Sequence, residues 1–291
     1  MRVLIAGYGF VGEALGERLL ARGDEVFGLR RSFAPGKGSK AKPFRRVAAD
    51  LLDSSTLVGL PEVDAIVYAA SPCGRNAMAY SAIYGDGFSN LIEAYRGGKG
   101  GNVPGRVIFV SSTSVYGQGG DVAIDESTPI EPKTETARTL AEAEERARQR
   151  VPSLSILRLS GIYGPGRTHL IRTVMNGEIP AHDPLTNRIH REDAAQAIER
   201  IIDVASPAPL YLGVDDEPAR LSEVRAFIAS ELCRLGHPPP PPSVPSAIRA
   251  MSGSKRIQNR ALRSIGFSPR YPSYREGYPA IVAGYLASIA R

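Results

Sequence analysis

Short apolar runs alternate along the chain with longer segments in which apolar residues recur every three or four positions. The first run, residues 2–7, has the length and composition of a buried strand, and the segment after it has the spacing of a helix that Gly23 ends. Similar apolar runs predict six further strands, at residues 25–29, 45–50, 64–70, 106–112, 154–160 and 209–214. Helical spacing predicts helices at residues 77–96, 137–150, 191–205, 221–236 and 275–290.

Strands that alternate with helices at this spacing predict βαβ units and a parallel sheet. We therefore predict an α/β fold, a doubly wound parallel sheet of the Rossmann type with helices on both faces. Glycine and proline become frequent after Gly161, and the predicted helices shorten. This change predicts a nucleotide-binding core and a smaller discontinuous substrate lobe, formed by residues 1–160 with 189–214 and by residues 161–188 with 215–291 respectively.

The composition is that of an ordinary globular protein. The 291 residues are 43% hydrophobic and 23% charged, a balance that predicts a buried core rather than disorder. The two cysteines, Cys73 and Cys233, stand in no metal-binding or disulfide pattern and indicate a reducing compartment. The chain starts directly with a predicted strand and has no apolar run long enough to span a bilayer, so a cytoplasmic protein is expected.

The net charge of +6 is not spread evenly along the chain. From the end of the second predicted strand to the start of the third there are seven basic residues and no acid: Arg30, Arg31, Lys37, Lys40, Lys42, Arg45 and Arg46. Such a run is typical of a solvated surface loop, of a nucleic-acid patch, or of an anion site for part of a cofactor. Nucleic-acid binding is the least favoured of the three, because only Phe33 and Phe44 stand among these charges.

A glycine motif joins the first predicted strand to the first predicted helix. Gly7, Gly9 and Gly12 have the spacing G-x-G-x-x-G, and their place between a strand and a helix is the context in which that motif binds a dinucleotide. The first glycine permits a tight turn, the second lets the backbone approach a pyrophosphate, and the third allows close helix–strand packing. The predicted cofactor loop is therefore Gly7, Tyr8, Gly9, Phe10, Val11 and Gly12.

The end of the second predicted strand indicates which dinucleotide is bound. Proteins that bind NAD place an acid there to hold the ribose 2′-hydroxyl, whereas this chain has Arg30, Arg31 and Ser32. Two guanidinium groups and a hydroxyl suit a 2′-phosphate, which arginine binds through paired, charge-assisted hydrogen bonds. The cofactor predicted from these residues is NADP(H).

Together with the glycine loop, several motifs resemble the extended short-chain dehydrogenase/reductase superfamily, that of the NAD-dependent epimerases and dehydratases. These are AADLLD, VYAAS, YGDGFSNLIEA, VSSTSVYG, ILRLSGIYGPGR and RIHREDAAQAI, and they extend nearly from end to end of the chain. The resemblance implies that Asp50 and Leu51 contact the adenine ring, and that Ala69, Ala70 and Ser71 border a ribose of the cofactor. In a doubly wound fold the ligand is expected beyond the carboxyl ends of the strands, here between the core and the lobe.

The chain departs from this family at the catalytic pair. Family members carry Y-x-x-x-K on the helix after the active-site strand, where the lysine lowers the pKa of the tyrosine that transfers a proton. The aligned residues here are Thr136 and Leu140, while the third hydroxyl position falls on Ser112. A threonine hydroxyl is too weak an acid to replace such a phenol. The chain therefore resembles the atypical members that keep the fold and vary at the catalytic pair.

Several other residues of the chain are candidates for the proton donor. Tyr84, in the segment that lies near the nicotinamide in relatives, is the favoured candidate. Tyr116 and Tyr163 are expected to pack and to position neighbours, and His190 to cap a helix. Cys73 is expected to be a small core residue. The predicted catalytic residues are thus Ser112, Tyr84 and, more weakly, Thr136.

Two functions of different classes are consistent with this sequence. The first is an NADP(H)-dependent oxidoreductase or epimerase-like enzyme that acts on a hydroxyl or carbonyl of a nucleotide sugar, or of another polar metabolite, with a non-standard proton donor. The second is a non-catalytic NADP(H)-binding redox sensor or structural subunit, which the loss of the Tyr/Lys pair favours. The resemblance further suggests a homodimer.

Overall fold

The computed structural model describes residues 1–33, 44–98, 101–245 and 253–290. Its centre is a sheet of seven strands in the order β12-β7-β5-β4-β1-β2-β3, and all six pairings between them are parallel. The strands are β1 (Arg2–Ala6), β2 (Glu25–Arg30), β3 (Arg45–Ala48), β4 (Ala65–Tyr68), β5 (Arg106–Ser112), β7 (Ser155–Leu159) and β12 (Leu210–Gly213). The predicted doubly wound parallel sheet is confirmed.

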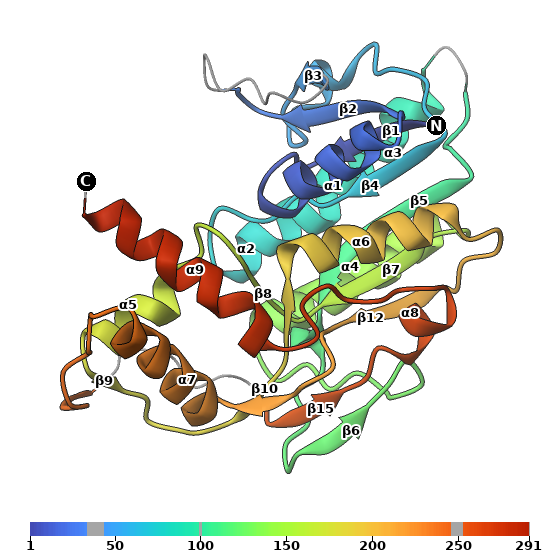
Figure 1. Cartoon of the computed structure of the whole chain (residues 1–291). Coiled ribbons are helices and arrows are strands. Elements are labelled where there is room, and N and C mark those ends of the chain that lie inside the picture. The colour runs from blue at the N-terminus through green and yellow to red at the C-terminus, as the bar shows by residue number, and fades with distance from the viewer. Residues whose placement is uncertain (34–43, 99–100, 246–252, 291) are drawn as a thin grey trace.

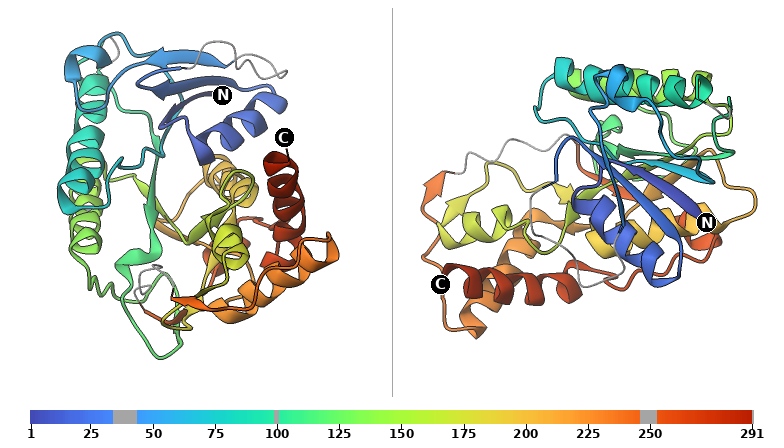
Figure 2. Two further views of the ribbon diagram at one scale, coloured as in Figure 1. Left: turned by 90° about the vertical axis from the view of Figure 1, so that its left-hand side faces the viewer. Right: turned by 90° about the horizontal axis from the view of Figure 1, so that it is seen from above.

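Helices cover both faces of this sheet (Figures 1 and 2). One face carries α1 (Phe10–Ala21) and α6 (Arg191–Asp203), and the other carries η1 (Ser54–Leu57), α2 (Ala77–Tyr80), the π-helical η2 (Ser81–Gly87), α3 (Phe88–Arg96) and α4 (Glu135–Arg150). The chain order of the strands reverses between β1 and β4. Ligands of such sheets bind beside the point of reversal, at the carboxyl ends of the strands.

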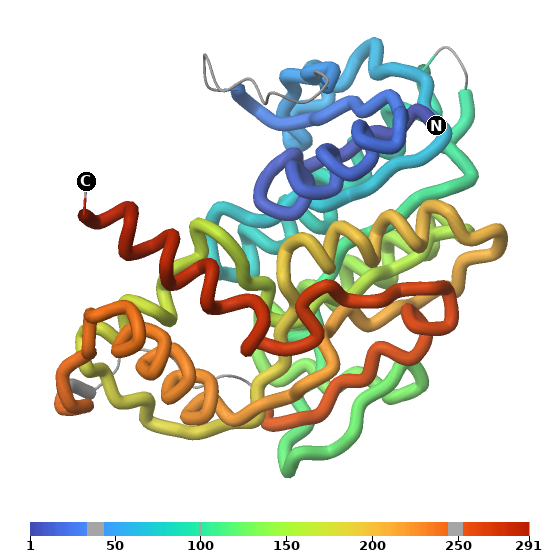
Figure 3. Tube along the Cα trace, viewed as in Figure 1, coloured from blue at the N-terminus to red at the C-terminus, as the bar shows by residue number. Residues whose placement is uncertain are grey.

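The smaller part of the molecule lies beyond the carboxyl ends of the strands. Figure 3 shows that its segments, yellow-green, orange and red, lie side by side although they are far apart in the sequence. Its helices are α5 (His169–Met175), α7 (Leu221–Arg234) and α9 (Tyr274–Ile289), which share a separate hydrophobic cluster. The exact division into core and lobe at the predicted boundaries stays a prediction.

Short paired strands lie outside the central sheet. Four two-stranded pairs join β6 (Val122–Ile124) with β15 (Lys255–Ile257), β8 (Gly161–Tyr163) with β11 (Arg188–His190), β9 (Glu178–Ile179) with β14 (Val244–Pro245), and β10 (Leu185–Thr186) with β13 (Ala219–Arg220). The remaining elements are η3 (Thr113–Val115) and α8 (Arg260–Ser264). Within the described residues, no helix has the length and apolar character needed to cross a membrane.

The predicted helix at residues 77–96 has a π-helical middle that the spacing did not predict. A π turn shifts the backbone hydrogen bonds from the i+4 to the i+5 residue and often marks a functional site. The hydroxyl of Tyr68, on β4, donates to the carbonyl of Ile83 within η2 at 2.5 Å. This contact comes from a distant strand, so the periodicity of residues 77–96 alone does not contain it.

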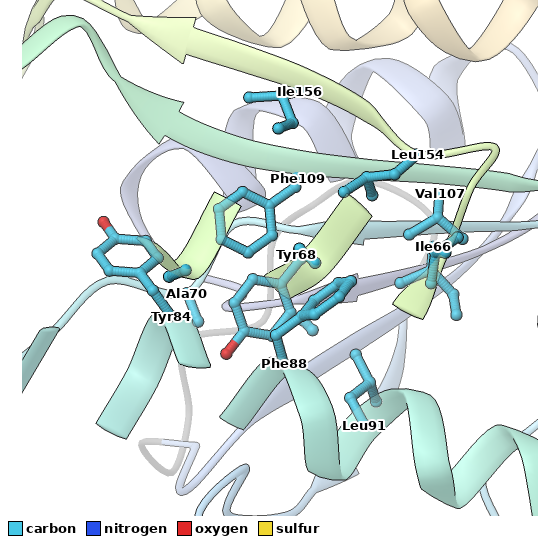
Figure 4. Close-up of a cluster of buried hydrophobic side chains, with 14 of the residues drawn as sticks. Ile66, Tyr68, Ala70, Tyr84, Phe88, Leu91, Val107, Phe109, Leu154 and Ile156 are labelled. Atoms are coloured by element: carbon cyan, nitrogen blue, oxygen red, sulfur yellow. The ribbon is translucent and has the colours of Figure 1, made fainter. Parts of the chain in front are cut away.

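An apolar cluster fills the space between the sheet and this helical layer. Figure 4 shows Ile66, Tyr68, Val107 and Phe109 of β4 and β5 packed against Phe88 and Leu91 of α3. The rings of Tyr68 and Phe109 are stacked 5.6 Å apart, and Phe88 meets both rings edge on. This packing fixes the strand ends from which the candidate site is built.

Candidate functional site

The glycine loop between β1 and α1 depends on two close backbone approaches. Gly7 has a φ of +96°, and a Cβ placed on it would lie 2.3 Å from the backbone nitrogen of Ala70. A Cβ on Gly12 would lie 2.5 Å from the carbonyl oxygen of Gly7. The first glycine therefore permits the turn beside β4, and the third permits close packing of α1, as the motif predicted.

The middle glycine faces open space. A Cβ on Gly9 would meet no atom within 4 Å, and the backbone nitrogens of the first turn of α1 have no acceptor within the helix. A helix N-terminus with free N–H groups and the positive end of the helix dipole suits a phosphate. The ring of Tyr8, in contrast, is buried and stacks on Phe44, with the ring centroids 4.2 Å apart. The Tyr8 side chain therefore supports the loop by packing in the protein interior.

The carboxyl end of β2 is basic, as predicted. Arg30 is half exposed, and its Nη1 lies 3.4 Å from the carbonyl oxygen of Tyr8 and 3.5 Å from a carboxylate oxygen of Glu13. Its guanidinium carbon also lies 5.6 Å from the ring centroid of Phe33, over which Arg46 of β3 lies at 5.5 Å. Arg46 is therefore a further cation near the end of β2, beside the predicted residues Arg30, Arg31 and Ser32.

The second arginine of the predicted set points toward the end of β4. Nη2 of Arg31 lies 3.1 Å from the sulfur of Cys73. Both described cysteines are exposed, so the expectation that Cys73 is a core residue is wrong. The residue before Ser71, Ala70, packs on Gly7, which places the segment from Ala69 to Ser71 beside the glycine loop.

The predicted adenine contacts lie in the turn after β3. The carboxylate of Asp50 accepts the backbone N–H of Leu52 at 3.0 Å and thereby closes the turn. Leu51 is buried, and its carbonyl accepts Nδ2 of Asn90 on α3 at 2.9 Å. Asp50 thus shapes the backbone at this point, and Leu51 belongs to the apolar cluster. Their contact with adenine stays a prediction.

Ser112 ends β5 at the carboxyl edge of the sheet. Its Oγ accepts the backbone N–H of Ser114 at 3.1 Å and so caps η3. Because this bond uses only an oxygen lone pair, the proton of the hydroxyl remains available to a ligand. The next residue, Thr113, is buried and shares a hydrogen bond of 3.2 Å with Ser160 after β7.

The positions of the family's catalytic pair lie at the start of α4. Thr136 is half-buried, and its hydroxyl lies 3.2 Å from that of Thr134, the residue that caps the helix. Leu140 is completely buried in the cluster between the sheet and the helices. The position of the lysine is therefore filled by an apolar side chain that packs into the core.

Tyr84 lies in the π-helical segment, next to the apolar cluster. Figure 4 shows its ring beside the cluster, with the hydroxyl pointing away from Phe109. The ring centroids of Tyr84 and Phe109 lie 5.9 Å apart, and Tyr80 packs on the other side at 5.4 Å. Burial, together with Tyr80, raises the pKa of Tyr84 above its ordinary value. Tyr84 is thus suited to donate a hydrogen bond as a neutral phenol, and not to lose its proton easily.

A buried ionic network holds the active-site strand against α4. The guanidinium of Arg158, on β7, donates two bonds to the carboxylate of Glu144 on α4, from Nε at 3.1 Å and from Nη2 at 2.5 Å. The same carboxylate accepts the hydroxyl of Ser111, the neighbour of Ser112. Arg158 also donates to the hydroxyl of Tyr116, which is fully buried. Tyr116 therefore has the positioning role that was expected.

Two more residues that were weighed as proton donors have structural partners. The hydroxyl of Tyr163 donates to the carbonyl of Ser273 at 3.1 Å and joins β8 to the start of α9. Nδ1 of His190 accepts the backbone N–H of Glu192 at 3.3 Å and caps α6. Both predictions of a structural role are confirmed.

Stability should depend on pH through His190. Burial, with the nearby charges of Arg191 and Arg270, lowers the pKa of His190 to about 4. The unfolded chain therefore binds one more proton than the folded protein between about pH 4 and 6.5, and stability falls by up to about 3 kcal/mol as the pH drops through that window. Urea unfolding at pH 4 to 7 should show a shallower decline for His190→Asn, whose side chain also caps helices. Equal slopes for the two proteins would contradict this assignment.

Part of the predicted basic run lies outside the described residues, namely Lys37, Lys40 and Lys42. Of the described members, Arg45 pairs with Glu25 across β2 and β3 at 2.5 Å. Arg30 and Arg46 gather around Phe33, as described above. This gathering places a compact positive group at the end of β2. Nucleic-acid binding was the least favoured role for this basic run, and that ranking stays a prediction.

Comparison with known proteins places the chain in a family. The model of the NAD dependent epimerase/dehydratase family matches residues 3–208. The chain therefore belongs to this family, and the resemblance found in its motifs is confirmed. The prediction of an NAD(P)-dependent, epimerase-like oxidoreductase is confirmed at this level, and a nicotinamide dinucleotide is supported as the cofactor.

Individual relatives agree with this placement. Protein YeeZ of Escherichia coli strain K12 is 29% identical over 279 residues, which are 93% of this chain and 96% of that protein. A solved structure from Methylobacillus flagellatus that carries the name of the same family is 33% identical, with a TM-score of 0.79 over 100% of this chain and 99% of its own. The UDP-glucose 4-epimerase of Thermus thermophilus, solved with NAD, is 20% identical with a TM-score of 0.76 over 99% and 100% of the chains, and shares the fold.

Proposed function

We propose that the protein is an NADP(H)-dependent, epimerase-like oxidoreductase that acts on a hydroxyl or carbonyl carbon of a nucleotide sugar or another polar metabolite. The observation that carries the choice of cofactor is the basic end of β2. Arg30 ends β2, Arg31 follows it directly, and Arg46 belongs to the neighbouring strand β3, while no acid of β2 stands at the ribose position. A 2′-phosphate would find two or three guanidinium groups there, and a bare 2′-hydroxyl would lack its usual carboxylate partner.

The described residues fit a dinucleotide at the carboxyl ends of the strands. The open side of Gly9 and the first turn of α1 suit the pyrophosphate, as argued above. Ala69, Ala70 and Ser71 follow β4 on the other side of the glycine loop, where a ribose would pass. A bound nicotinamide would supply or accept the hydride, and the protein would supply orientation and hydrogen bonds.

Ser112 and Tyr84 are the proposed polar groups for the reacting oxygen. The hydroxyl of Ser112 has its proton free, so it can donate to a carbonyl or alkoxide oxygen of the substrate. Tyr84 is a neutral phenol, burial raises its pKa further, and it would act as a second donor. Thr136 contributes at most a hydroxyl for positioning. The proton of the reaction would then come from water that reaches the site.

The double variant Arg30→Ala/Arg31→Ala tests the choice of cofactor. Because each charge-assisted bond to a phosphate is worth about 1.5–3 kcal/mol, NADPH affinity should fall about 100-fold or more, while NADH affinity changes little. Isothermal titration calorimetry with both nucleotides measures this. Arg45→Ala, from the same basic run but paired with Glu25, is the matched control and should leave both affinities within about threefold. An equal fall for NADPH and NADH would refute a 2′-phosphate site.

The test of catalysis is transfer of hydride from deuterium-labelled NADPH to a panel of nucleotide sugars and other carbonyl substrates, read by mass spectrometry. Label should appear in at least one product with the wild-type protein. Ser112→Ala should lower the rate about 100-fold, as for other donors to a developing oxyanion. A substrate that accepts label equally fast with Ser112→Ala would remove Ser112 from the reaction.

One observation favours a second function, that of a non-catalytic NADP(H)-binding sensor or structural subunit. Leu140 occupies the lysine position and is completely buried, so nothing on that turn of α4 tunes a proton donor. A sensor should bind one redox state of the cofactor much more tightly than the other. A catalyst that uses both states should bind NADPH and NADP+ with similar affinity.

The homodimer suggested by the resemblance stays a prediction.

A further inference from the structure

Two arginines pack on Phe10, the first residue of α1, directly beside the glycine loop. The guanidinium carbon of Arg167 lies 4.3 Å from the centroid of the Phe10 ring, and that of Arg191 lies 5.0 Å from it. Arg167 comes from the segment between β8 and α5, and Arg191 is the first residue of α6. Segments far apart in the sequence thus bring two cations to the point where α1 begins.

A glycine makes this arrangement sterically feasible. Gly164, three residues before Arg167, has a φ of +149°. A Cβ on it would lie 2.9 Å from Cγ of Arg191 and 3.3 Å from Cζ of Phe10. Any larger residue would push apart the aromatic ring and the arginine stem. The backbone is therefore shaped so that both arginine side chains reach the ring.

The charges at this point are only partly balanced by the described residues. Arg167 forms no ion pair within the described residues, and the one hydrogen bond of its side chain there runs from Nη1 to the carbonyl of Ile162 at 2.9 Å. Although much of the residue is exposed, the guanidinium lies against the ring, and the partial burial lowers the pKa of Arg167. Arg191 pairs with Glu192 through Nε alone, at 3.1 Å. Its two terminal nitrogens have no partner among the described residues.

Three positive features therefore meet at one place. The guanidinium carbons lie within about 9 Å of each other, since both contact one ring, so one anion can reach both charges. The amino end of α1 adds the positive pole of its dipole. Such a cluster is unfavourable without an anion and favourable with one, because arginine and free backbone N–H groups both bind phosphate oxygens.

We propose that Arg167 and Arg191 bind the pyrophosphate of the dinucleotide, together with the glycine loop. This inference rests on the proposed function and deepens it. The two charges of a pyrophosphate match the two guanidinium groups, and Phe10 is the apolar support that holds them in place. Because Arg167 belongs to the segment that leads into α5, cofactor binding also ties the smaller part of the molecule to the nucleotide core.

Calorimetric titration of Arg167→Gln and Arg191→Gln with NADPH and with 2′-AMP tests the proposal. The first ligand has a pyrophosphate, and the second has a 2′-phosphate without one. Each variant should lose about 10- to 100-fold in NADPH affinity and keep its affinity for 2′-AMP within about threefold. Arg172→Gln removes an exposed arginine of α5 and is the matched control, for which both affinities should stay unchanged.

The urea midpoint of each unliganded variant is the second measurement, and a midpoint that shows a folded protein assigns a loss of affinity to binding rather than to unfolding. Unchanged NADPH affinity in both variants would overturn the proposal, and so would an equal fall for NADPH and 2′-AMP. If the wild-type protein bound no dinucleotide, the proposed function itself would fail, and this result is distinct from the other two.

Discussion

Gly7→Ala is expected to abolish high-affinity dinucleotide binding. The residue has a φ of +96°, and its new Cβ would lie 2.3 Å from the backbone nitrogen of Ala70 and 2.5 Å from the carbonyl carbon of Ala69. These are backbone atoms, so the turn between β1 and α1 must move away from β4. The free N–H groups at the start of α1 would move with it. Loss of two such bonds to phosphate corresponds to a fall in affinity of about 100-fold or more.

A second glycine supplies the control for this prediction. Gly23, at the end of α1, has a φ of +95°, and a Cβ on it would meet nothing within 4 Å. Gly23→Ala should therefore show only the strain of a left-handed residue, about 1–2 kcal/mol in urea unfolding, with NADPH affinity unchanged. Gly7→Ala should lose binding as well as stability. If the two variants behaved alike in calorimetric titration, the close approach at Gly7 would have no functional importance.

Glu144→Ala is expected to destabilise the protein by about 3–5 kcal/mol in urea unfolding. The side chains of Glu144 and Arg158 are 4% and 6% exposed, so the substitution would leave a guanidinium buried without its counter-charge. It would also remove the acceptor of the Ser111 hydroxyl. Ser112 follows in the same strand, so activity should fall in the protein that remains folded.

Glu93 provides an exposed pair for comparison. Its carboxylate lies 2.9 Å from both Arg96 and Arg150, and its side chain is 53% exposed. Glu93→Ala should change the free energy of unfolding by no more than about 1 kcal/mol, because solvent screens such pairs. A loss for Glu144→Ala as small as that for Glu93→Ala would show that the buried network contributes little.

The central fold was predictable because the inner parallel strands are covered on both faces. Strands such as β1 and β4 are apolar almost throughout, and their sequence pattern contains this information directly. The glycine loop was also predictable from the sequence, because local backbone geometry sets the three roles of Gly7, Gly9 and Gly12. The basic end of β2 was predictable because Arg30, Arg31 and Ser32 follow one another in the chain. The cofactor preference inferred from them stays a proposal.

Features that depend on distant contacts were not predictable. The π segment of residues 81–87 relies on Tyr68 of another strand. Arg46 reaches the end of β2 only because β3 pairs with β2 in a particular register. Arg167 and Arg191 meet Phe10 only in the folded chain, and their motifs gave no sign of it. The exposure of Cys73 likewise depends on the path of the loop after β4.

The most direct test of the central claim is calorimetric titration of the purified wild-type protein with NADPH, NADP+, NADH and NAD+ in one buffer. The account predicts similar affinities for NADPH and NADP+, and affinities about 100-fold weaker for NADH and NAD+, because only the phosphorylated forms meet Arg30 and Arg31. Equal or tighter binding of NADH and NAD+, or no binding of any of the four, would contradict it.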